Sequence, residues 1–306
     1  MLALLLPGQG AQTPGMLAPW LSDEGKKLLS SWSLHIDLDL ERLGTTASAD
    51  EIKDTANAQP LIVAAGLLGA NALEELNVSK FSVVAGHSVG EITAAAIAGV
   101  VTNVQAMELV RQRGIAMAKA ASENETGMAA VLGGDRAQVL QAISELKLVA
   151  ANDNGAGQIV AAGSLDALDK LIENPPAGAR VRPLAVAGAF HTHFMQSAVE
   201  HVDKFSKQLQ INAPKRELLS NRDGAVVNSG EDAINRIVNQ IANPVRWDLC
   251  MEALVQLGVT GVIELPPAGT LVGLLKRATP SIETFALKSP DDLSAALDFS
   301  KKHGGA

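Results

Sequence analysis

The sequence predicts an α/β fold in which helices pack on a mainly parallel sheet, with a smaller α/β unit inserted in the chain. Residues 2–6 and 83–85 are continuous apolar runs rather than alternating ones, which is typical of strands buried on both faces. Each run leads into a glycine-rich turn. Aromatic residues make up only 3% of the chain, so Ala, Val and Leu must fill the core, and the many Ala and Gly residues allow helices to pack closely on a sheet.

The composition is that of a soluble globular protein. The 306 residues suffice for one large domain or two modest ones, and 47% hydrophobic with 19% charged residues is an ordinary balance. The net charge of −8 argues against a general nucleic-acid-binding surface. The single Cys250 excludes a disulfide framework and is compatible with a reducing cytoplasm. The apolar residues 1–6 stop at Pro7-Gly8, too short a run for a signal peptide or a membrane span. We therefore expect a cytoplasmic protein with no nucleic-acid or membrane partner.

The stretch FSVVAGHSVG, residues 81–90, carries the strongest chemical signal. It predicts a strand, a sharp G-x-S-x-G turn and a helix, and the flanking glycines leave room for the turn to be tight. Such a corner lifts the Ser88 hydroxyl out of the sheet and places it at a helix N-terminus, where backbone N–H groups face developing negative charge. We interpret Ser88 as a nucleophile; the plain alternative is a serine that caps a helix.

The elements of the first part follow from the apolar pattern. The pattern predicts a strand at 2–6, a glycine-rich turn at 7–12, a helical stretch at 26–43, helices at 49–57 and 60–76, a strand at 83–85, and helices at 91–100 and 103–121. The helix at 60–76 is apolar nearly all round and should be buried. Gln9, in the first turn, would lie near the carboxyl edge of the sheet, as Ser88 does. A plain Gly-Pro turn is the alternative for Gln9.

The middle of the chain changes in composition and period. Strands are predicted at 128–132, 148–152, 158–162 and 180–186, with helices at 136–146 and 164–173. This βαββαβ order is that of a ferredoxin-like unit. We expect residues 123–187 to form an inserted subdomain, and residues 1–122 and 188–306 to form the larger catalytic domain.

The last part returns to the larger domain. The pattern predicts a helix from about 190 to 209, strands at 218–220 and 225–227, helices at 233–241 and 245–257, a strand at 259–264, a helix at 271–278, an edge strand at 284–287 and a final helix at 290–303.

A serine hydroxyl needs a base that takes its proton, and six histidines are candidates. His191 follows small residues at a loop-to-helix entrance late in the chain, where serine hydrolases of this topology place their base. His193 is the second choice. His87 should point to the other side of the turn, and the remaining three lie on polar helical stretches, where we expect them to be solvated: His35, His201 and His303.

No acidic residue stands out as a third member that orients the imidazole. Either a carboxylate is hidden elsewhere in the sequence or a backbone carbonyl holds the tautomer. His191-x-His193 has no nearby Cys or paired carboxylates, so no metal site is expected. Arg111 and Arg113 are two apart on a predicted helix and point about 200° from each other, so they should not serve one site.

Six motifs occur in one order along nearly the whole chain. They are PGQGAQ at 7–12, GHSVGE at 86–91, RG at 113–114, NGAGQIV at 154–160, GAFH at 188–191 and NPVRW at 243–247. Together they resemble the malonyl-CoA:acyl-carrier-protein transacylases of dissociated fatty-acid synthesis, most closely the actinobacterial members. The resemblance implies an α/β-hydrolase-like large domain with an inserted ferredoxin-like small domain.

The resemblance also implies a ping-pong acyl transfer without a cofactor. Ser88 matches the family's nucleophile and His191 its general base. Ser88 would take the malonyl group from malonyl-CoA, and the phosphopantetheine thiol of an acyl carrier protein would then accept it. Gln9 and Val89 match the oxyanion-hole positions, through their backbone N–H groups.

Further positions of the family's site are matched as well. Arg113 matches the arginine that pairs with the free carboxylate of malonate, a role for which a planar fork is suited and lysine is not. Asn154 and the carbonyls around Val245 and Arg246 match positions near the catalytic histidine, where a carbonyl replaces the acid. Phe190 makes the motif GAFH, the form of this motif that the family associates with malonyl rather than methylmalonyl units.

The chain departs from the family's usual Gly-Pro-Gly turn at residues 266–269, which read PPAG. Three alternatives stay open: the acyltransferase subunit of a malonate decarboxylase, a serine esterase of the same fold, and a carrier-binding module without activity. Because carrier proteins are acidic, docking should use a basic pair, either Lys276 and Arg277 or Lys215 and Arg216.

Overall fold

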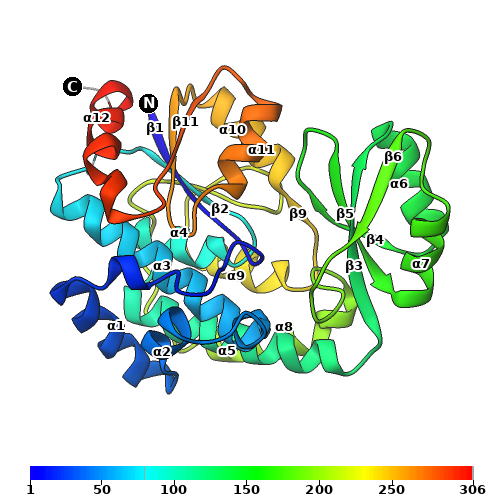
Figure 1. Cartoon of the computed structure of the whole chain (residues 1–306), viewed down its shortest axis with the longest axis horizontal. Coiled ribbons are helices and arrows are strands. Elements are labelled where there is room, and N and C mark those ends of the chain that lie inside the picture. The colour runs from blue at the N-terminus through cyan, green and yellow to red at the C-terminus, as the bar shows by residue number, and fades with distance from the viewer. Residues whose placement is uncertain (79, 305–306) are drawn as a thin grey trace.

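The computed structural model describes residues 1–78 and 80–304 and contains two sheets of different size. In Figure 1 the large sheet and most helices form one body, and the small sheet with its two helices stands beside it. The large sheet has the strand order β11-β10-β1-β2-β7-β8 within the described residues. Its strands are β1 (Leu2–Leu6), β2 (Val83–Gly86), β7 (Glu217–Leu219), β8 (Val226–Val227), β10 (Gly261–Glu264) and β11 (Glu283–Ala286).

The large sheet is parallel except at one edge, where β8 pairs antiparallel with β7. The central strand β1 is buried throughout, and its side chains alternate between two cores. Leu4 and Leu6 pack with the helices of one face, while Ala3 and Leu5 pack on the other face in a cluster that includes Trp247. This double burial is the reason why the strand is continuously apolar, as the sequence predicted.

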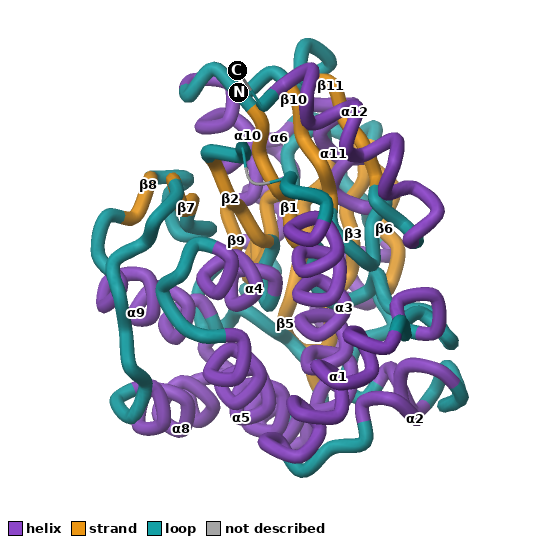
Figure 2. The backbone as a smooth tube through the Cα atoms, turned by 90° about the vertical axis from the view of Figure 1, so that its left-hand side faces the viewer, coloured by secondary structure: helices purple, strands orange, loops and turns teal. Residues whose placement is uncertain are grey.

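Helices cover both faces of the large sheet. They are α1 (Asp23–Ile36), α2 (Leu40–Thr45), α3 (Thr55–Glu75), α4 (Gly90–Ile97), α5 (Asn103–Ser122), α8 (Gln196–Ser206), α9 (Gly230–Gln240), α10 (Trp247–Gln256), α11 (Thr270–Ala278) and α12 (Leu293–His303), with short 3₁₀ turns at Ala18–Trp20, Glu51–Lys53, His193–Met195 and Pro290–Asp292. Figure 2 shows α4 close to the strands, and α1, α5 and α8 farther from the sheet. The predicted helix at 245–257 starts later, because residues 245 and 246 form a strand.

The helix predicted at 60–76 is confirmed within α3, which begins earlier, at Thr55; the helix predicted at 49–57 is wrong, because a 3₁₀ turn at Glu51–Lys53 and the start of α3 occupy those residues. Pro60 lies inside α3, where it cannot donate to the carbonyl of Ala56 four residues earlier. That carbonyl instead accepts a hydrogen bond from Arg111 Nη1 at 3.0 Å. By length and composition α3 could cross a membrane, but 72% of its apolar window is buried inside the protein, so it is a core helix, as the sequence predicted for residues 60–76.

The small sheet has the strand order β6-β3-β5-β4-β9. Its elements are β3 (Thr126–Gly133), α6 (Arg136–Glu145), β4 (Val149–Asp153), β5 (Gln158–Ser164), α7 (Leu165–Glu173), β6 (Ala179–Pro183) and β9 (Val245–Arg246). The first six follow the predicted βαββαβ order. The last strand, β9, follows about 60 residues after β6 in the chain, outside residues 123–187, and pairs parallel with β4. The domain boundaries at 122/123 and 187/188 stay a prediction.

The sheet topology brings distant turns together at one edge. β1 and β2 are parallel neighbours, in register from Ala3 with Val83 to Leu6 with Gly86. The turn that holds Gln9 and the turn that holds Ser88 therefore leave the sheet side by side, since parallel strands end at the same edge. His87 N–H donates to the Leu6 carbonyl at 2.9 Å, which ties the second turn to the end of β1.

Candidate active site

Ser88 lies on a strained turn between β2 and α4. Its φ is 53°, in the left-handed region that a residue with a side chain adopts at a cost of about 1–2 kcal/mol. Neither flanking glycine could be replaced by a larger residue, because an added Cβ would clash with the backbone. A Cβ on Gly86 would lie 2.0 Å from the Gly90 carbonyl carbon, and a Cβ on Gly90 would lie 2.2 Å from the Leu6 carbonyl oxygen. The G-x-S-x-G spacing therefore reports a backbone that has no room for other residues at these two positions.

His191 is the histidine that reaches Ser88, as the sequence predicted. The Ser88 Oγ lies 2.8 Å from His191 Nε2, and His191 Nδ1 lies 2.7 Å from the carbonyl oxygen of Gln240. Because that carbonyl can only accept, Nδ1 carries the hydrogen and Nε2 presents its lone pair to the serine hydroxyl. His191 is also left-handed, with φ 61°, and its N–H donates to the Ile241 carbonyl at 3.2 Å.

The carbonyl that orients the imidazole is not the predicted one. Val245 and Arg246 form β9 against β4, and the Arg246 N–H donates to the Asn221 carbonyl at 2.7 Å. Gln240 is the last residue of α9, and carbonyls in the last turn of a helix have no partner within the helix. The Gln240 carbonyl accepts the Asn243 N–H at 3.2 Å, and its second lone pair takes the His191 N–H.

The other histidines lie away from the serine hydroxyl or serve another purpose. His193 is exposed and stacks on Phe194, with ring centroids 4.2 Å apart. His35 and His201 are exposed, as predicted. His303 is only 6% exposed, so its predicted solvation is wrong; its Nδ1 lies 3.0 Å from Thr260 Oγ1, at the start of the sheet.

Arg113 places a positive charge inside the protein beside the serine. It is 1% exposed, and it donates to Gln59 Oε1 at 2.8 Å, to Gln240 Oε1 at 3.1 Å and to Ser88 Oγ at 3.3 Å. Its buried Nε–H has no protein partner among the described residues. Burial lowers the pKa of Arg113 to about 10, so the guanidinium stays charged at neutral pH. Arg111 does not share this site, as its predicted position around the helix requires: it donates to the Ala56 carbonyl instead.

Burial is the main influence on the protonation state of the imidazole. Burial lowers the pKa of His191 to about 3, and the nearby Arg113 acts in the same direction. The hydrogen bond to the Gln240 carbonyl opposes this shift but does not reverse it. His191 is therefore neutral at physiological pH, which is the form that can accept a proton from Ser88.

A cavity of about 400 Å³ opens above these groups, between the two sheets. It is lined by Gly8, Gln9, Gly10, Ala11, Gln59, His87, Ser88, Met117, Met128, Ala130, Asn152, Asn154, Gln158, Val160, Leu184, Val186, Phe190, His191, Thr270, Leu271, Leu274 and Arg277. Phe190 is 5% exposed and adjoins His191 in this wall. In residues 1–78 and 80–304 no group of three or more His, Cys, Asp and Glu is placed to hold a metal ion.

The predicted oxyanion donors lie at the ends of the two neighbouring strands. Val89 follows Ser88 directly and caps α4, so its N–H is one of those that a helix start leaves without an intrahelical acceptor. Gln9 lines the cavity, and its side chain donates to Thr55 Oγ1 at 3.3 Å. Asn154 also lines the cavity; its Oδ1 lies 2.9 Å from His87 Nε2 rather than at the His191 ring.

Sequence reasoning missed four polar residues of this site: Gln59, Glu91, Asn221 and Gln240. All four are at least 95% buried, and each contacts another member of the set or Arg113. A polar residue on an otherwise apolar helix face was the available signal, clearest for Gln59 within α3. Asn221 lies in a loop and carries no such signal.

A neutral histidine beside a strained serine, with a buried arginine and a cavity above them, defines an enzyme that transfers acyl groups through its serine. The comparisons with known proteins agree. The chain belongs to the acyl transferase family, because the model of the acyl transferase domain matches residues 4–292. The resemblance found in the six motifs is thereby confirmed.

Similar proteins cover nearly the whole length of the chain. It is 54% identical over 296 residues to the malonyl CoA-acyl carrier protein transacylase of Mycobacterium tuberculosis strain H37Rv. The match covers 96% of this chain and 98% of that protein. The crystal structure of MCAT from Mycobacterium tuberculosis superposes with a TM-score of 0.95 at 52% identity, covering 97% of this chain and 99% of that one.

A second solved structure is a malonyl-transacylase in complex with its type II polyketide synthase acyl-carrier protein. It superposes with a TM-score of 0.93 at 30% identity, over 97% of this chain and 99% of that chain. These likenesses confirm the predicted fold class, an α/β-hydrolase-like domain with a ferredoxin-like subdomain.

The low pKa of His191 predicts an unusual pH dependence. Since kcat/KM reports ionisations of the free enzyme, its value for the acyl-CoA substrate should change by less than about threefold between about pH 5 and about pH 7. The neutral imidazole persists over that range, so acidification does not remove the base. Circular dichroism at each pH serves as the control for folding. A tenfold fall per pH unit below about 6.5 would mean an ordinary histidine pKa and would contradict this assignment.

Proposed function

We propose that the protein transfers the malonyl group of malonyl-CoA to the phosphopantetheine thiol of an acyl carrier protein, through a malonyl ester on Ser88. The observation that carries the proposal is the buried guanidinium of Arg113, whose Nη2 lies 3.3 Å from the Ser88 Oγ. An acyl group with a free carboxylate gains an ion pair there that an acetyl group cannot form. The names of the relatives and the carrier-protein complex point to the same substrates.

In the first half-reaction, Ser88 Oγ attacks the thioester carbonyl carbon while its proton passes to His191 Nε2. The backbone N–H groups of Val89 and Gln9 would stabilise the negative charge on the carbonyl oxygen. The carbon–sulfur bond then breaks, and the leaving CoA sulfur takes the proton from His191. In the second half-reaction the carrier thiol attacks the ester, and the same proton path runs through His191 back to Ser88. No cofactor takes part in these steps.

The shape of the cavity supports a small acyl group. Phe190 forms part of the wall next to His191 and is almost fully buried, so a methyl branch on the malonyl unit would meet its ring. The acyl-CoA and carrier arms must share the opening of the cavity, because both thiols react at the same Ser88. We place the reaction in the cytoplasm, where both substrates of fatty-acid synthesis would be found.

Of the two basic pairs considered for carrier docking, Lys276 and Arg277 have the better position. Arg277 lines the cavity above Ser88, and Lys276 precedes it on α11 as an exposed residue. An acidic carrier seated on this helix would have its arm at the opening of the cavity. Charge complementarity of this kind chiefly raises the rate of productive encounter.

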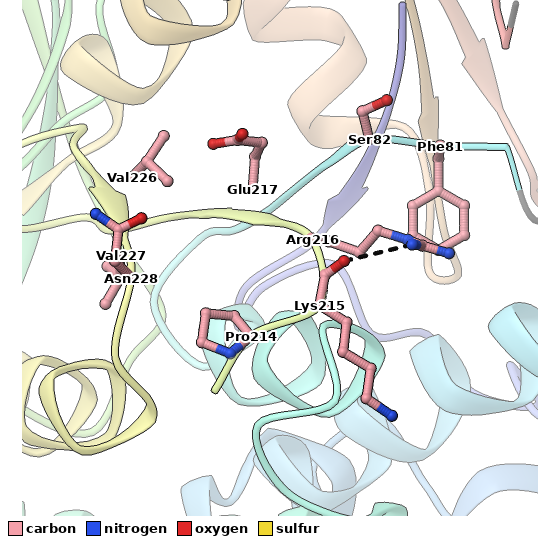
Figure 3. Close-up of a pocket in the computed structure, with 9 residues that line it drawn as sticks. All are labelled: Phe81, Ser82, Pro214, Lys215, Arg216, Glu217, Val226, Val227 and Asn228. Carbon is pink, nitrogen blue, oxygen red and sulfur yellow. Dashed lines mark hydrogen bonds between the residues drawn. The ribbon is translucent and has the colours of Figure 1, made fainter. Parts of the chain in front are cut away.

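The other pair, Lys215 and Arg216, borders a separate surface pocket of about 450 Å³, shown in Figure 3. Phe81 in that pocket lies just before β2, and Arg216 lies over its ring at 5.1 Å and just before β7. The pocket is thus at the amino ends of these strands. Ser88 follows the carboxyl end of β2, so a carrier docked at this pocket would face the wrong edge of the sheet.

The first test of the function is the intact mass of the protein after brief mixing with malonyl-CoA. We expect one malonyl adduct on the wild type and none on Ser88→Ala, with loss of the adduct when a carrier protein bearing phosphopantetheine is added. Release of free malonate without a thiol acceptor would favour the esterase alternative. A carrier protein from a malonate decarboxylase should be tested beside a fatty-acid carrier, since preference for the former would indicate the decarboxylase subunit.

Substituting Arg113→Ala should remove malonyl selectivity. Loss of the buried ion pair should lower kcat/KM for malonyl-CoA at least ~100-fold, while acetyl transfer stays within about fivefold of the wild type. Parallel assays with both acyl-CoAs measure this ratio. Arg111→Ala, on the same helix but bonded to the Ala56 carbonyl, is the matched control and should retain selectivity. An equal loss with both donors would contradict the role of Arg113.

Reversing the charges at α11 should weaken carrier docking. The variant Lys276→Glu/Arg277→Glu, first loaded with malonyl, should need about tenfold more carrier protein for half-maximal discharge, and the effect should shrink in high salt. The matched variant Lys215→Glu/Arg216→Glu changes the charge equally and should discharge like the wild type. The reverse outcome would move the docking site to the pocket of Figure 3.

A further inference from the structure

Glu91 is a buried acidic residue that the reaction above does not use. It lies in the first turn of α4, three residues after Ser88, and is 4% exposed. One carboxyl oxygen accepts the Asn221 N–H at 2.6 Å, and the other accepts a hydrogen from the side-chain amide of Gln240. We propose that Glu91 is a positioning residue that fixes the Gln240 amide and, through it, the guanidinium of Arg113 that receives the substrate carboxylate. This inference rests on the proposed malonyl transfer.

The direction of the Gln240 side-chain amide is set by the groups on its two sides. Its Nε2 faces two acceptors, the Glu91 carboxyl and Asn221 Oδ1, the latter at 3.0 Å. Its Oε1 faces Arg113 Nη2 at 3.1 Å. An amide nitrogen only donates and a guanidinium only donates, so the reversed amide would set donor against donor at Arg113. The acceptors on the far side therefore determine that an oxygen faces the arginine.

A carboxyl at position 91 can accept from both of its neighbours, and an amide cannot. An amide in place of the Glu91 carboxyl would have to face Asn221 N–H with its oxygen, which leaves its NH₂ toward Gln240. Gln240 would then either keep its NH₂ against that NH₂, or turn and set its oxygen against Asn221 Oδ1 and its NH₂ against Arg113. A buried donor left without an acceptor is costly, so the Arg113 guanidinium would no longer be held in this position. Both oxygens of a carboxyl can accept, and the oxygen of its O–H keeps a lone pair for this when the acid is protonated, so a carboxyl avoids this conflict.

The same carboxyl also reaches the nucleophile turn through Asn221. The Asn221 Oδ1 accepts the Ser88 N–H at 2.8 Å, and its Nδ2 donates to the Gly86 carbonyl at 2.7 Å. Burial raises the pKa of the Glu91 carboxyl to about 8, while the Asn221 N–H and the charges of Arg113 and Arg236 act in the opposite direction. The three segments joined here are α4, the loop after β7 and the end of α9.

The experiment is the isosteric variant Glu91→Gln, assayed for transfer from malonyl-CoA and from acetyl-CoA. We expect the ratio of the two kcat/KM values to fall by about tenfold or more, through the malonyl value. Acetyl transfer should be retained, because the Gln240 carbonyl that orients His191 belongs to the backbone and not to the reoriented amide. Calorimetric titration of malonyl-CoA and acetyl-CoA into Ser88→Ala, with and without Glu91→Gln, should show the same selective loss in binding.

Two comparisons separate positioning from general loosening. Ile237→Val removes buried packing on α9 one turn before Gln240 and should leave the malonyl-to-acetyl ratio unchanged. If Glu91→Gln does not fold, the pair Glu91→Asp and Glu91→Asn makes the same comparison of carboxyl with amide at equal length, and only the Asp variant should keep selectivity. An unchanged ratio, or a parallel loss with both donors, would overturn the inference. A wild type that does not prefer malonyl-CoA would instead overturn the proposed function.

Discussion

A single positive charge held inside the protein constrains the whole site. Moving a guanidinium out of water costs several kcal/mol unless its hydrogen bonds are made. Arg113 makes them to three neutral oxygens, on Gln59, Gln240 and Ser88. These neutral acceptors take three hydrogen bonds without cancelling the charge, and the Nε–H has no partner among the described residues, so the attraction for a substrate carboxylate is preserved. The carboxyl of Glu91 is separated from Arg113 by the side-chain amide of Gln240.

The same constraint explains why a backbone carbonyl stands where many serine enzymes have an acid. A carboxylate in direct contact with His191 Nδ1 would lie beside the Gln240 side chain, and hence close to Arg113. It would pair with the guanidinium and weaken the site for the substrate's own carboxylate. The Gln240 carbonyl orients the imidazole at 2.7 Å without adding a charge. Burial and Arg113 then keep His191 neutral, which is the state a base requires.

Features of the site that depend on local sequence were predictable, and features that depend on long-range packing were not. Ser88 and the strand before it were predictable because a local turn needs glycine at fixed spacing and a buried strand is apolar. Gln240 and Asn221 were not, because their roles depend on where a helix ends and how a loop packs on an element more than 100 residues away. The error at residues 245–246 has this cause: the sequence shows that α9 ends nearby, but not which carbonyl then faces His191.

Hydrogen bonds to buried groups hold the backbone of the two reacting residues in a strained conformation. Ser88 and His191 are both left-handed, at φ 53° and 61°, and each such residue costs about 1–2 kcal/mol. Relaxing either turn would separate the 2.8 Å contact between the two side chains. Hydrogen bonds from the strained N–H groups to Asn221 Oδ1 and to the Ile241 carbonyl oppose that relaxation. Because Asn221 is itself held by Glu91, the carboxyl behind the site supports both the geometry of attack and the charge that selects the substrate.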